Sequence, residues 1–290
     1  MTDSTTAKIK LACMTLPYMK YPLERALQGI SEAGYRYIAF GLPHAGAEAP
    51  DEQDPEAVHT LRRLFDRYGV EPVMLVSTNQ LAPGQPIERA QKRFETAKAL
   101  GIPELLCLGV WGYRAFPHEP LPADELQQLN AAFIEKYREV AKLAEQYNIV
   151  VTLKPHTGNT ATAAIIAETI AAIGSPYVRV CYDPGNVHFY EGIDPAKDME
   201  LLPVSQITSF IAKDHQGERA ENRFPIPGRG DVNFPSMLGQ LIRGGFEGPV
   251  VVERLDGPVP GEQPTPEQID GLIREAREEL ESLIAAAQST

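Results

Sequence analysis

Four apolar runs in the second half of the chain end in residues that can transfer protons or bind a small polar molecule. They close with Lys154-Pro155-His156, Asp183-Pro184-Gly185-Asn186, Lys213-Asp214-His215 and Glu253-Arg254. Carboxylates, imidazoles and ammonium groups in a partly desolvated site are suited to acid–base catalysis and to stabilising an oxyanion. One charged group could simply cap a strand, but four successive runs that end in this way favour a shared site.

These four runs belong to a longer series of strand-like segments. The series predicts the sheet that positions their polar ends. The series is KLACMTL, YRYIAFGL, EPVMLVST, PELLCLGVW, IVVTLKPH, VRVCYDPGN, ITSFIAKDH and GPVVVERL, over residues 10–16, 35–42, 71–78, 103–111, 149–156, 178–186, 207–215 and 248–255. Between them lie amphipathic stretches with apolar residues at helical spacing and glycine stops, such as Leu61, Leu64 and Phe65 before Gly69. Alternating strands and helices indicate a parallel sheet.

Eight strands with seven connecting helices and a closing helix over residues 267–287 predict an α/β fold, a (β/α)₈ TIM barrel, with residues 1–290 as a single domain. An open doubly wound sheet is the alternative, but no GxGxxG follows the first strand. The proline-rich stretch 255–268 is expected to be a long βα loop. Because barrel chemistry sits at the carboxyl ends of the strands, the four polar ends are expected to converge there.

Side-chain alternation along a strand refines this expectation. It places Lys154 and His156 on one face, and Lys213 and His215 on another, so each pair is expected to point together at the barrel mouth. Glu253 ends the run VVVE, where partial desolvation would raise the pKa of its carboxylate and Lys154 or a metal would lower it, so that a pKa near neutrality is obtainable.

Composition limits the classes of partner that the protein is expected to bind. Lys and Arg total 27 against 39 Asp and Glu, and the net charge of −12 disfavours nucleic acid. The opening MTDSTTAKIK lacks the apolar core of a signal peptide and no apolar run reaches a membrane span, so we expect a cytoplasmic protein with no membrane partner. Cys13, Cys107 and Cys181 form no CxxC pair and are expected to be buried free thiols. The oligomeric state stays open, with a homo-oligomer among the alternatives.

Several motifs of the second half resemble the sugar phosphate isomerase/epimerase family, the xylose isomerase-like TIM barrels. They are YDPGN, GIDPAKD, IAKDH, PGRGDVNF and GGFEGPVVVE, while the first half matches in its rhythm and in the opening segment GISEAGYRYIAF. The resemblance implies a (β/α)₈ barrel acting in carbohydrate metabolism on a small sugar. Relatives include ketose epimerases, isomerases, dehydratases and an endonuclease branch, so it does not choose the substrate.

The resemblance also implies one divalent metal, Mn, Co or Mg. Its usual ligands are a glutamate ending strand five, an aspartate ending strand six, a histidine in strand seven and a glutamate ending strand eight. Asp183 and Glu253 match two of these places, but Lys154 and Ile211 stand at the other two. One interpretation is a relocated metal site of His156, Asp183, His215 and Glu253. In the other, Lys154 replaces the charge of the metal and polarises a substrate oxygen itself.

Further residues are candidates for substrate binding. Asn186 and His188 follow strand six, Asp214 lies between Lys213 and His215, and Arg229 lies in the glycine turn GRGD. Trp111 ends the fourth run, where an aromatic ring could cover the apolar face of a sugar. A plain turn at Arg229 and ordinary packing of Trp111 are the alternatives.

We therefore expect an isomerase, an epimerase or a related lyase that moves a proton next to a carbonyl of a small sugar or keto-sugar, through an enediolate. Glu253 is the predicted base, Lys154 the oxyanion stabiliser, and His156, Lys213 and His215 orient hydroxyls or supply a second acid or base. Two other functions remain open: a metal-dependent hydrolase of the endonuclease-like branch, and a non-catalytic sugar-binding barrel with a decayed metal site.

Overall fold

Eight parallel strands close into one barrel. The computed structural model describes residues 9–257 and 262–289, and the strands neighbour one another in the order β1-β10-β9-β8-β7-β4-β3-β2. They are β1 (Lys10–Met14), β2 (Tyr37–Phe40), β3 (Glu71–Val76), β4 (Glu104–Leu108), β7 (Val150–Lys154), β8 (Val178–Tyr182), β9 (Ile207–Ala212) and β10 (Pro249–Val252). Each lies within one of the eight predicted runs, so the predicted (β/α)₈ barrel is confirmed.

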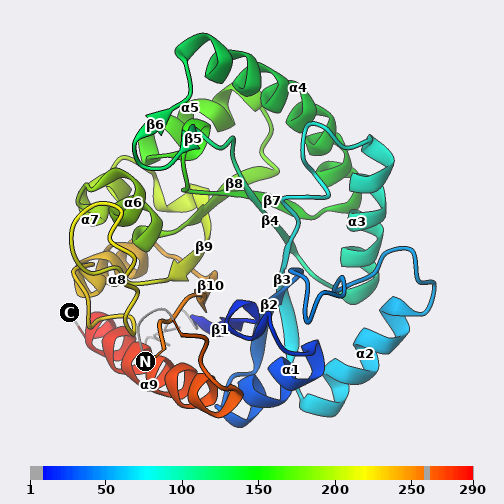
Figure 1. Cartoon of the computed structure of the whole chain (residues 1–290), viewed down its shortest axis with the longest axis vertical. Helices are drawn as coiled ribbons and strands as arrows, with labels where there is room; N and C mark the ends of the chain where they lie inside the picture. Colours follow the sequence, from blue (N-terminus) through cyan, green and yellow to red (C-terminus); the bar gives the residue numbers. More distant parts are fainter. Residues whose placement is uncertain (1–8, 258–261, 290) are drawn as a thin grey trace, which may run out of the picture.

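The helices form an outer ring around this barrel (Figure 1). They are α1 (Leu23–Glu32), α2 (Ala57–Tyr68), α3 (Ile87–Leu100), α4 (Ala123–Tyr147), α5 (Ala163–Ile173), α6 (Pro184–Glu191), α7 (Pro195–Met199), α8 (Phe234–Arg243) and α9 (Pro266–Gln288). Gly69 ends α2 in the left-handed conformation, as the glycine stop predicted. None of the helices within residues 9–257 and 262–289 is both long and apolar enough to span a bilayer.

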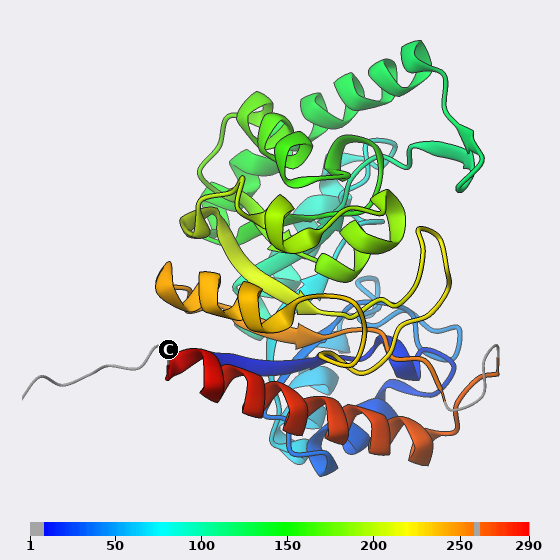
Figure 2. The same ribbon diagram turned by 90° about the vertical axis from the view of Figure 1, so that its left-hand side faces the viewer.

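The fourth strand is shorter than its sequence run. β4 ends at Leu108, so Trp111 lies beyond the strand, and the chain then forms a small hairpin of β5 (Tyr113–Ala115) and β6 (Glu119–Pro120). The backbone N–H of Val110 donates to the Asn159 side chain at 2.7 Å, which replaces a strand partner. The hairpin and other long connections gather at one end of the barrel (Figure 2). Two predictions fall partly outside the described residues. They concern the opening segment, examined for a signal peptide, and the loop 255–268, and the residues left out are 1–8, 258–261 and 290.

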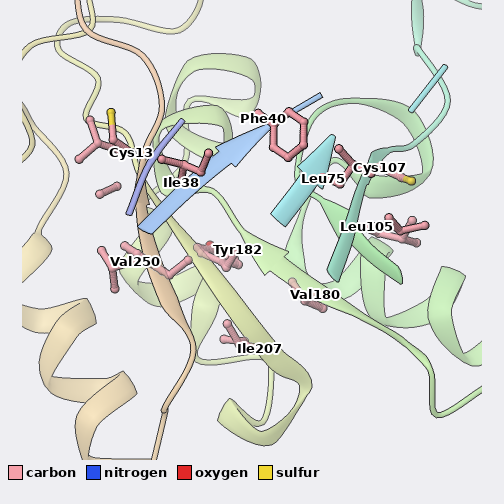
Figure 3. Close-up of a cluster of buried hydrophobic side chains, with 14 of the residues drawn as sticks. Cys13, Ile38, Phe40, Leu75, Leu105, Cys107, Val180, Tyr182, Ile207 and Val250 are labelled. Carbon is pink, nitrogen blue, oxygen red and sulfur yellow. The ribbon is translucent and has the colours of Figure 1, made fainter. Parts of the chain in front are cut away.

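Apolar side chains fill both faces of the strands. The outward face packs beneath the helices and includes Cys13, Phe40, Leu75, Cys107, Val180 and Tyr182 (Figure 3). A separate inner cluster fills the barrel with Ala12, Met14, Ala39, Met74, Leu106, Cys181, Ile211 and Val251. The three cysteines are buried free thiols, as expected.

One acidic side chain lies inside the barrel, toward the amino-terminal ends of the strands. Glu104 is fully buried, and its Oε1 accepts hydrogen bonds from Ser209 at 2.6 Å and from Thr152 at 2.7 Å. Burial raises the pKa of Glu104 to about 7, although these hydrogen bonds oppose the rise. The barrel therefore binds this proton more tightly than the unfolded chain does.

This proton makes stability depend on pH in a defined direction. The unfolded chain releases it near the ordinary pKa of 4.5 and the folded chain near 7, so stability is lost as the pH rises between these values. The difference amounts to about 3 kcal/mol. Urea unfolding at pH 5 and pH 8 measures how far the free energy of unfolding falls between these two values. In Glu104→Gln this fall should be smaller than in the parent chain by about the same amount. The control Glu71→Gln, exposed at the start of β3, should follow the parent chain, and an unchanged loss in Glu104→Gln would contradict the prediction.

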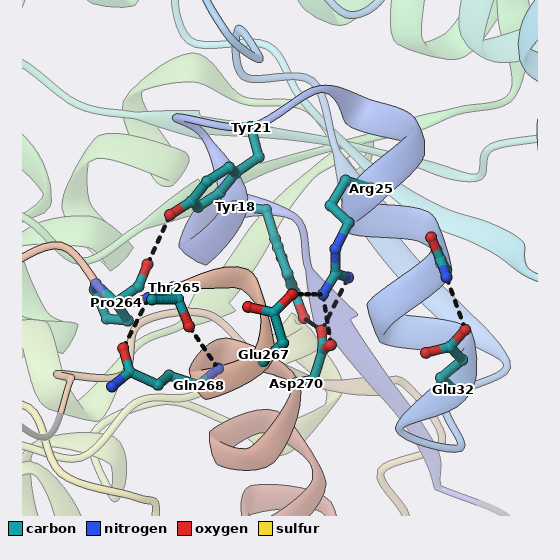
Figure 4. A network of polar contacts seen from close by, with 10 residues as sticks. Tyr18, Tyr21, Arg25, Glu32, Pro264, Thr265, Glu267, Gln268 and Asp270 are labelled. Carbon is teal, nitrogen blue, oxygen red and sulfur yellow. Dashed lines mark hydrogen bonds and ion pairs between the residues drawn. The ribbon is translucent and has the colours of Figure 1, made fainter.

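Hydrogen bonds join the region around α1, the first helix, to α9, the last helix (Figure 4). The Asp270 carboxylate on α9 accepts hydrogen bonds from the Tyr18 hydroxyl at 2.5 Å and from Arg25 at 2.6 and 3.1 Å. Thr265 and Gln268 form a capping box that starts α9 beside this contact. One carboxylate thus joins the two ends of the barrel's helix ring.

Replacing Asp270 by Ala should lower the free energy of unfolding by about 2 kcal/mol, because it leaves the buried Tyr18 hydroxyl without its partner. The matched control is Glu267→Ala, whose carboxylate lies 3.7 Å from Arg25 but is 78% exposed. That change should cost at most about 0.5 kcal/mol. Equal losses in chemical denaturation would show that the Asp270 contact carries no special stability.

Candidate functional site

Two lysines and two carboxylates form a buried cluster at the carboxyl ends of β7 to β10. We call Lys154, Asp183, Lys213 and Glu253 the charge quartet. Lys213 Nζ lies 2.8 Å from Asp183 Oδ2 and 2.9 Å from Glu253 Oε1, and Lys154 Nζ lies 3.2 Å from Asp183 Oδ2 and also pairs with Glu253 Oε2. Each ammonium therefore contacts both carboxylates, and the four charges cancel.

Local backbone chemistry places these groups. The Oδ1 atom of Asp183 accepts the backbone N–H of Asn186 at 3.0 Å and so caps α6, which leaves Oδ2 for the lysines. Gly185 permits close packing here, since a Cβ atom would lie 2.6 Å from the Lys213 carbonyl oxygen. The motif DPGN is thus a helix start that brings an aspartate against β9.

Neighbouring charges shift the pKa values of Glu253 and Lys154. Burial alone would raise the pKa of Glu253, but Lys154 and Lys213 outweigh burial and lower this pKa to about 2. Burial would likewise lower the pKa of Lys154, but Glu253 and Asp183 outweigh it and raise this pKa. The near-neutral pKa predicted for Glu253 is therefore wrong. The lowering effect of Lys154 was expected, but the contact with a second ammonium group, that of Lys213, was not.

A pocket of about 570 Å³ opens above the quartet. Lys154, Lys213 and Glu253 reach it while remaining almost fully buried, so they form its floor. Its polar side is completed by His156, Asn186, Tyr190 and Arg254. The predicted convergence of the ends of four strands thus describes this face of the pocket.

His156 presents a neutral imidazole to the pocket. Burial and the charges of Lys154 and Lys213 lower its pKa to about 3. Its ring packs against Tyr190 at 4.5 Å and Trp111 at 5.2 Å between centroids. Trp111 is 42% exposed and does not line the pocket, so it contacts His156 without reaching the pocket itself.

His215, the second histidine predicted at the barrel mouth, does not line the pocket. The prediction that His215 shares the face of Lys213 is wrong, because β9 ends at Ala212 and strand alternation no longer applies beyond it. The Nδ1 atom of His215 lies 2.7 Å from Nδ1 of His188, and its Nε2 lies 2.6 Å from the Glu221 carbonyl oxygen. Neither His188 nor His215 lines the pocket.

Two other candidates have structural partners instead of a place in the pocket. The buried Asp214 carboxylate accepts backbone N–H groups from His215, Gly228, Gly230 and Val232 at 2.8 to 3.1 Å. Arg229 pairs with Glu275 at 2.9 Å and is half exposed on the surface of α9. These positions do not support the predicted contacts of Asp214 and Arg229 with substrate. Asn186 does line the pocket, and its amide donates to the Pro155 carbonyl oxygen at 2.7 Å.

The quartet does not fit a divalent metal. The ammonium of Lys154 lies between Asp183 and Glu253, and His215, a ligand in the relocated site, is directed elsewhere. Ile211, at the other altered ligand place, is buried in the apolar layer beneath the quartet. Across residues 9–257 and 262–289, no group of three or more histidine, cysteine or acidic side chains is arranged to hold a metal ion.

This misfit predicts that metals do not stabilise the fold. A ligand present at 1,000 times its dissociation constant would add about 4 kcal/mol of stability. We expect Mn²⁺ or Co²⁺ at millimolar concentration, and likewise EDTA, to shift the thermal midpoint by less than about 1 °C. NaCl of matched ionic strength is the control. A rise of several degrees with Mn²⁺, reversed by EDTA, would show that a metal displaces the lysines.

Sequence reasoning missed the opposite side of the pocket. Leu16, Leu42, Val76 and Leu108 follow or end the first four barrel strands, are half-buried and line the pocket. We call these four residues the apolar wall. The sequence signal for this wall is that the first four runs end without charged residues.

The fold and this site define a (β/α)₈ barrel with a charged pocket floor at the carboxyl ends of its strands. The model of the xylose isomerase-like TIM barrel family matches residues 27–278. The chain therefore belongs to the xylose isomerase-like TIM barrel family.

The chain is also similar to named proteins, and two solved structures share its fold. The rhizopine catabolism protein MocC of Rhizobium meliloti is 26% identical over 267 residues, which cover 82% of this chain and 76% of MocC. A xylose isomerase domain protein from Alicyclobacillus acidocaldarius superposes with a TM-score of 0.76 at 21% identity, covering 97% of this chain and 100% of that one. An L-ribulose 3-epimerase superposes with a TM-score of 0.70 at 15% identity, covering 97% and 96%.

Proposed function

We propose that the chain is an isomerase, epimerase or related lyase that moves a proton next to the carbonyl of a small sugar or keto-sugar. The observation that carries this proposal is the charge quartet at the floor of the pocket, where a carboxylate and two ammonium groups adjoin one another. Family membership and structural likeness to a sugar epimerase support the substrate class.

The proposed reaction uses Glu253 as the base. Its carboxylate takes the proton from the carbon next to the carbonyl, and the C–H electron pair forms the enediolate double bond while the carbonyl π pair moves to oxygen. Lys154 and Lys213 stabilise that oxyanion. Isomerisation returns this proton to the former carbonyl carbon while the α-hydroxyl proton moves to the oxyanion. Epimerisation adds a proton from solvent to the opposite face of the enediolate, and Glu253 releases its own proton to solvent. In elimination the β-hydroxyl leaves as water with the proton from Glu253.

The charge balance of the quartet explains how a carboxylate with a pKa of about 2 could act as this base. In the free protein two ammonium groups stabilise the Glu253 anion. During the transfer the negative charge leaves Glu253 and develops on a substrate oxygen beside the same ammonium groups. The lysines thus keep an anionic partner throughout, so the low pKa of the free protein does not set the cost of the transfer.

The test is solvent deuterium uptake. We expect purified protein in D₂O to exchange the hydrogen next to the carbonyl in at least one member of a panel of keto-sugars, followed by proton NMR. Lys154→Met should slow exchange by about 10² to 10³-fold, the loss typical of removing one oxyanion donor. EDTA-treated protein should exchange as fast as untreated protein. Binding without any exchange would instead favour a non-catalytic sugar-binding barrel.

A further inference from the structure

The pocket has two sides of opposite chemistry. Its floor and one side carry Lys154, His156, Asn186, Lys213 and Glu253 from β7 to β10 and the turns that follow them. The other side carries the apolar wall from the ends of β1 to β4, together with Met14 and Pro50. Glu48, Thr78, Asn79 and Gln80 also line this second side. The Thr78 hydroxyl already accepts the backbone N–H of Leu108 at 3.0 Å. The wall residues lie at the strand ends or two residues beyond them.

The apolar wall is incompletely covered. Met14 and Leu106 reach the pocket from the barrel core and are 2% exposed, whereas Leu16, Leu42, Val76 and Leu108 are only half-buried. Their uncovered surface faces a pocket of about 570 Å³, which has room for a ligand larger than the polar head group alone. A ligand with only hydroxyl groups would leave their hydrogen bonds unmade against this surface.

The geometry points to a substrate with two parts: an α-hydroxycarbonyl head that meets the quartet and an aryl or alkyl group that covers the apolar wall. This inference rests on the proposed function for the head and adds the chemical class of the rest of the molecule. An unsubstituted small sugar would fill only the polar side, so the apolar substituent supplies the selectivity.

A pair of probes separates the two parts. Dihydroxyacetone carries the head alone, and 2-hydroxyacetophenone replaces one hydroxymethyl group by a phenyl ring. We expect 2-hydroxyacetophenone to bind about 10- to 100-fold more tightly, the gain for burying one aromatic side chain. Ligand-observed NMR titration gives both dissociation constants, and the same samples in D₂O report exchange at the hydroxymethyl carbon.

Variants of the wall assign the preference to its residues. Val76→Thr keeps the branched shape and replaces one methyl group by a hydroxyl. Combined with Leu108→Asn, it should reduce the ratio of the two dissociation constants by at least about threefold. Because the ratio compares two probes in the same protein, a general loss of binding in the variant cancels. Leu201→Asn, a 63% exposed leucine that does not line the pocket, is the control and should keep the parent ratio. The single variant Val76→Thr serves if the double variant does not fold.

The outcomes for this inference and for the proposed function are distinct. Equal binding of the two probes, or a preference that survives the wall variants, overturns the inference even where exchange is fast. Tighter binding of 2-hydroxyacetophenone that depends on the wall supports the inference even where neither probe exchanges, and the missing exchange then counts against the proposed function.

Discussion

Lys213→Met should lower the free energy of unfolding by about 3 to 5 kcal/mol. Lys213 Nζ contacts Asp183 at 2.8 Å and Glu253 at 2.9 Å, and all three side chains are buried. Removing the lysine leaves two carboxylates with one ammonium, and an uncompensated buried charge costs about this much. Urea unfolding at pH 7 measures the loss.

Two controls assign this loss to charge balance. Arg229→Met also removes a cation 2.9 Å from a carboxylate, but at the surface, and should cost at most about 1 kcal/mol. Adding Glu253→Gln to Lys213→Met leaves Lys154 with Asp183 and restores neutrality, so the double variant should be less unstable than the sum of the single variants. Additive losses would mean that packing, not charge, determines the effect.

Glu253→Gln should slow deuterium exchange by about 10²-fold or more, because glutamine keeps the size of the side chain but cannot accept the proton. The experiment requires a variant that still binds a keto-sugar, which NMR titration checks. Glu48→Gln is the matched control, since Glu48 also lines the pocket but does not belong to the quartet, and it should exchange at the parent rate. Exchange at the parent rate in Glu253→Gln would move the role of base to His156.

The pH profile follows from the same charges. A base must be deprotonated, and the pKa of Glu253 is about 2 and that of His156 about 3 in the free protein. The second-order exchange rate should therefore stay flat from pH 5 to pH 8. The stability that Glu253 contributes is likewise complete above its ordinary pKa of 4.5 and is lost as the pH falls toward 2.

The barrel was predictable because its signal is repeated. Eight runs with intervening amphipathic stretches give the strand count, and every barrel strand falls within its run. The hairpin of β5 and β6 was not predicted, since its strands hold only three and two residues. Its position depends on contacts such as Val110 to Asn159, 49 residues apart, which local patterns do not contain.

The site was predictable up to the ends of regular strands. Alternation places Lys154 and His156 on one face, and both line the pocket. Asp183 and Glu253 were expected at the mouth because they end apolar runs, and both contact Lys154. Alternation fails at His215, three residues beyond β9. The pairing of each lysine with both carboxylates also depends on how four strands meet around the barrel, a distance relation that the order of residues alone does not determine.

The neutrality of the quartet limits how these four positions can change over generations. A single substitution that alters the charge would cost about 3 to 5 kcal/mol, a large share of the 5 to 15 kcal/mol that typically holds a domain folded. A second substitution of matching charge would remove most of that cost. Ancestors and descendants of this chain should therefore exchange residues at positions 154, 183, 213 and 253 in compensating pairs, and a mutant library should vary these codons together.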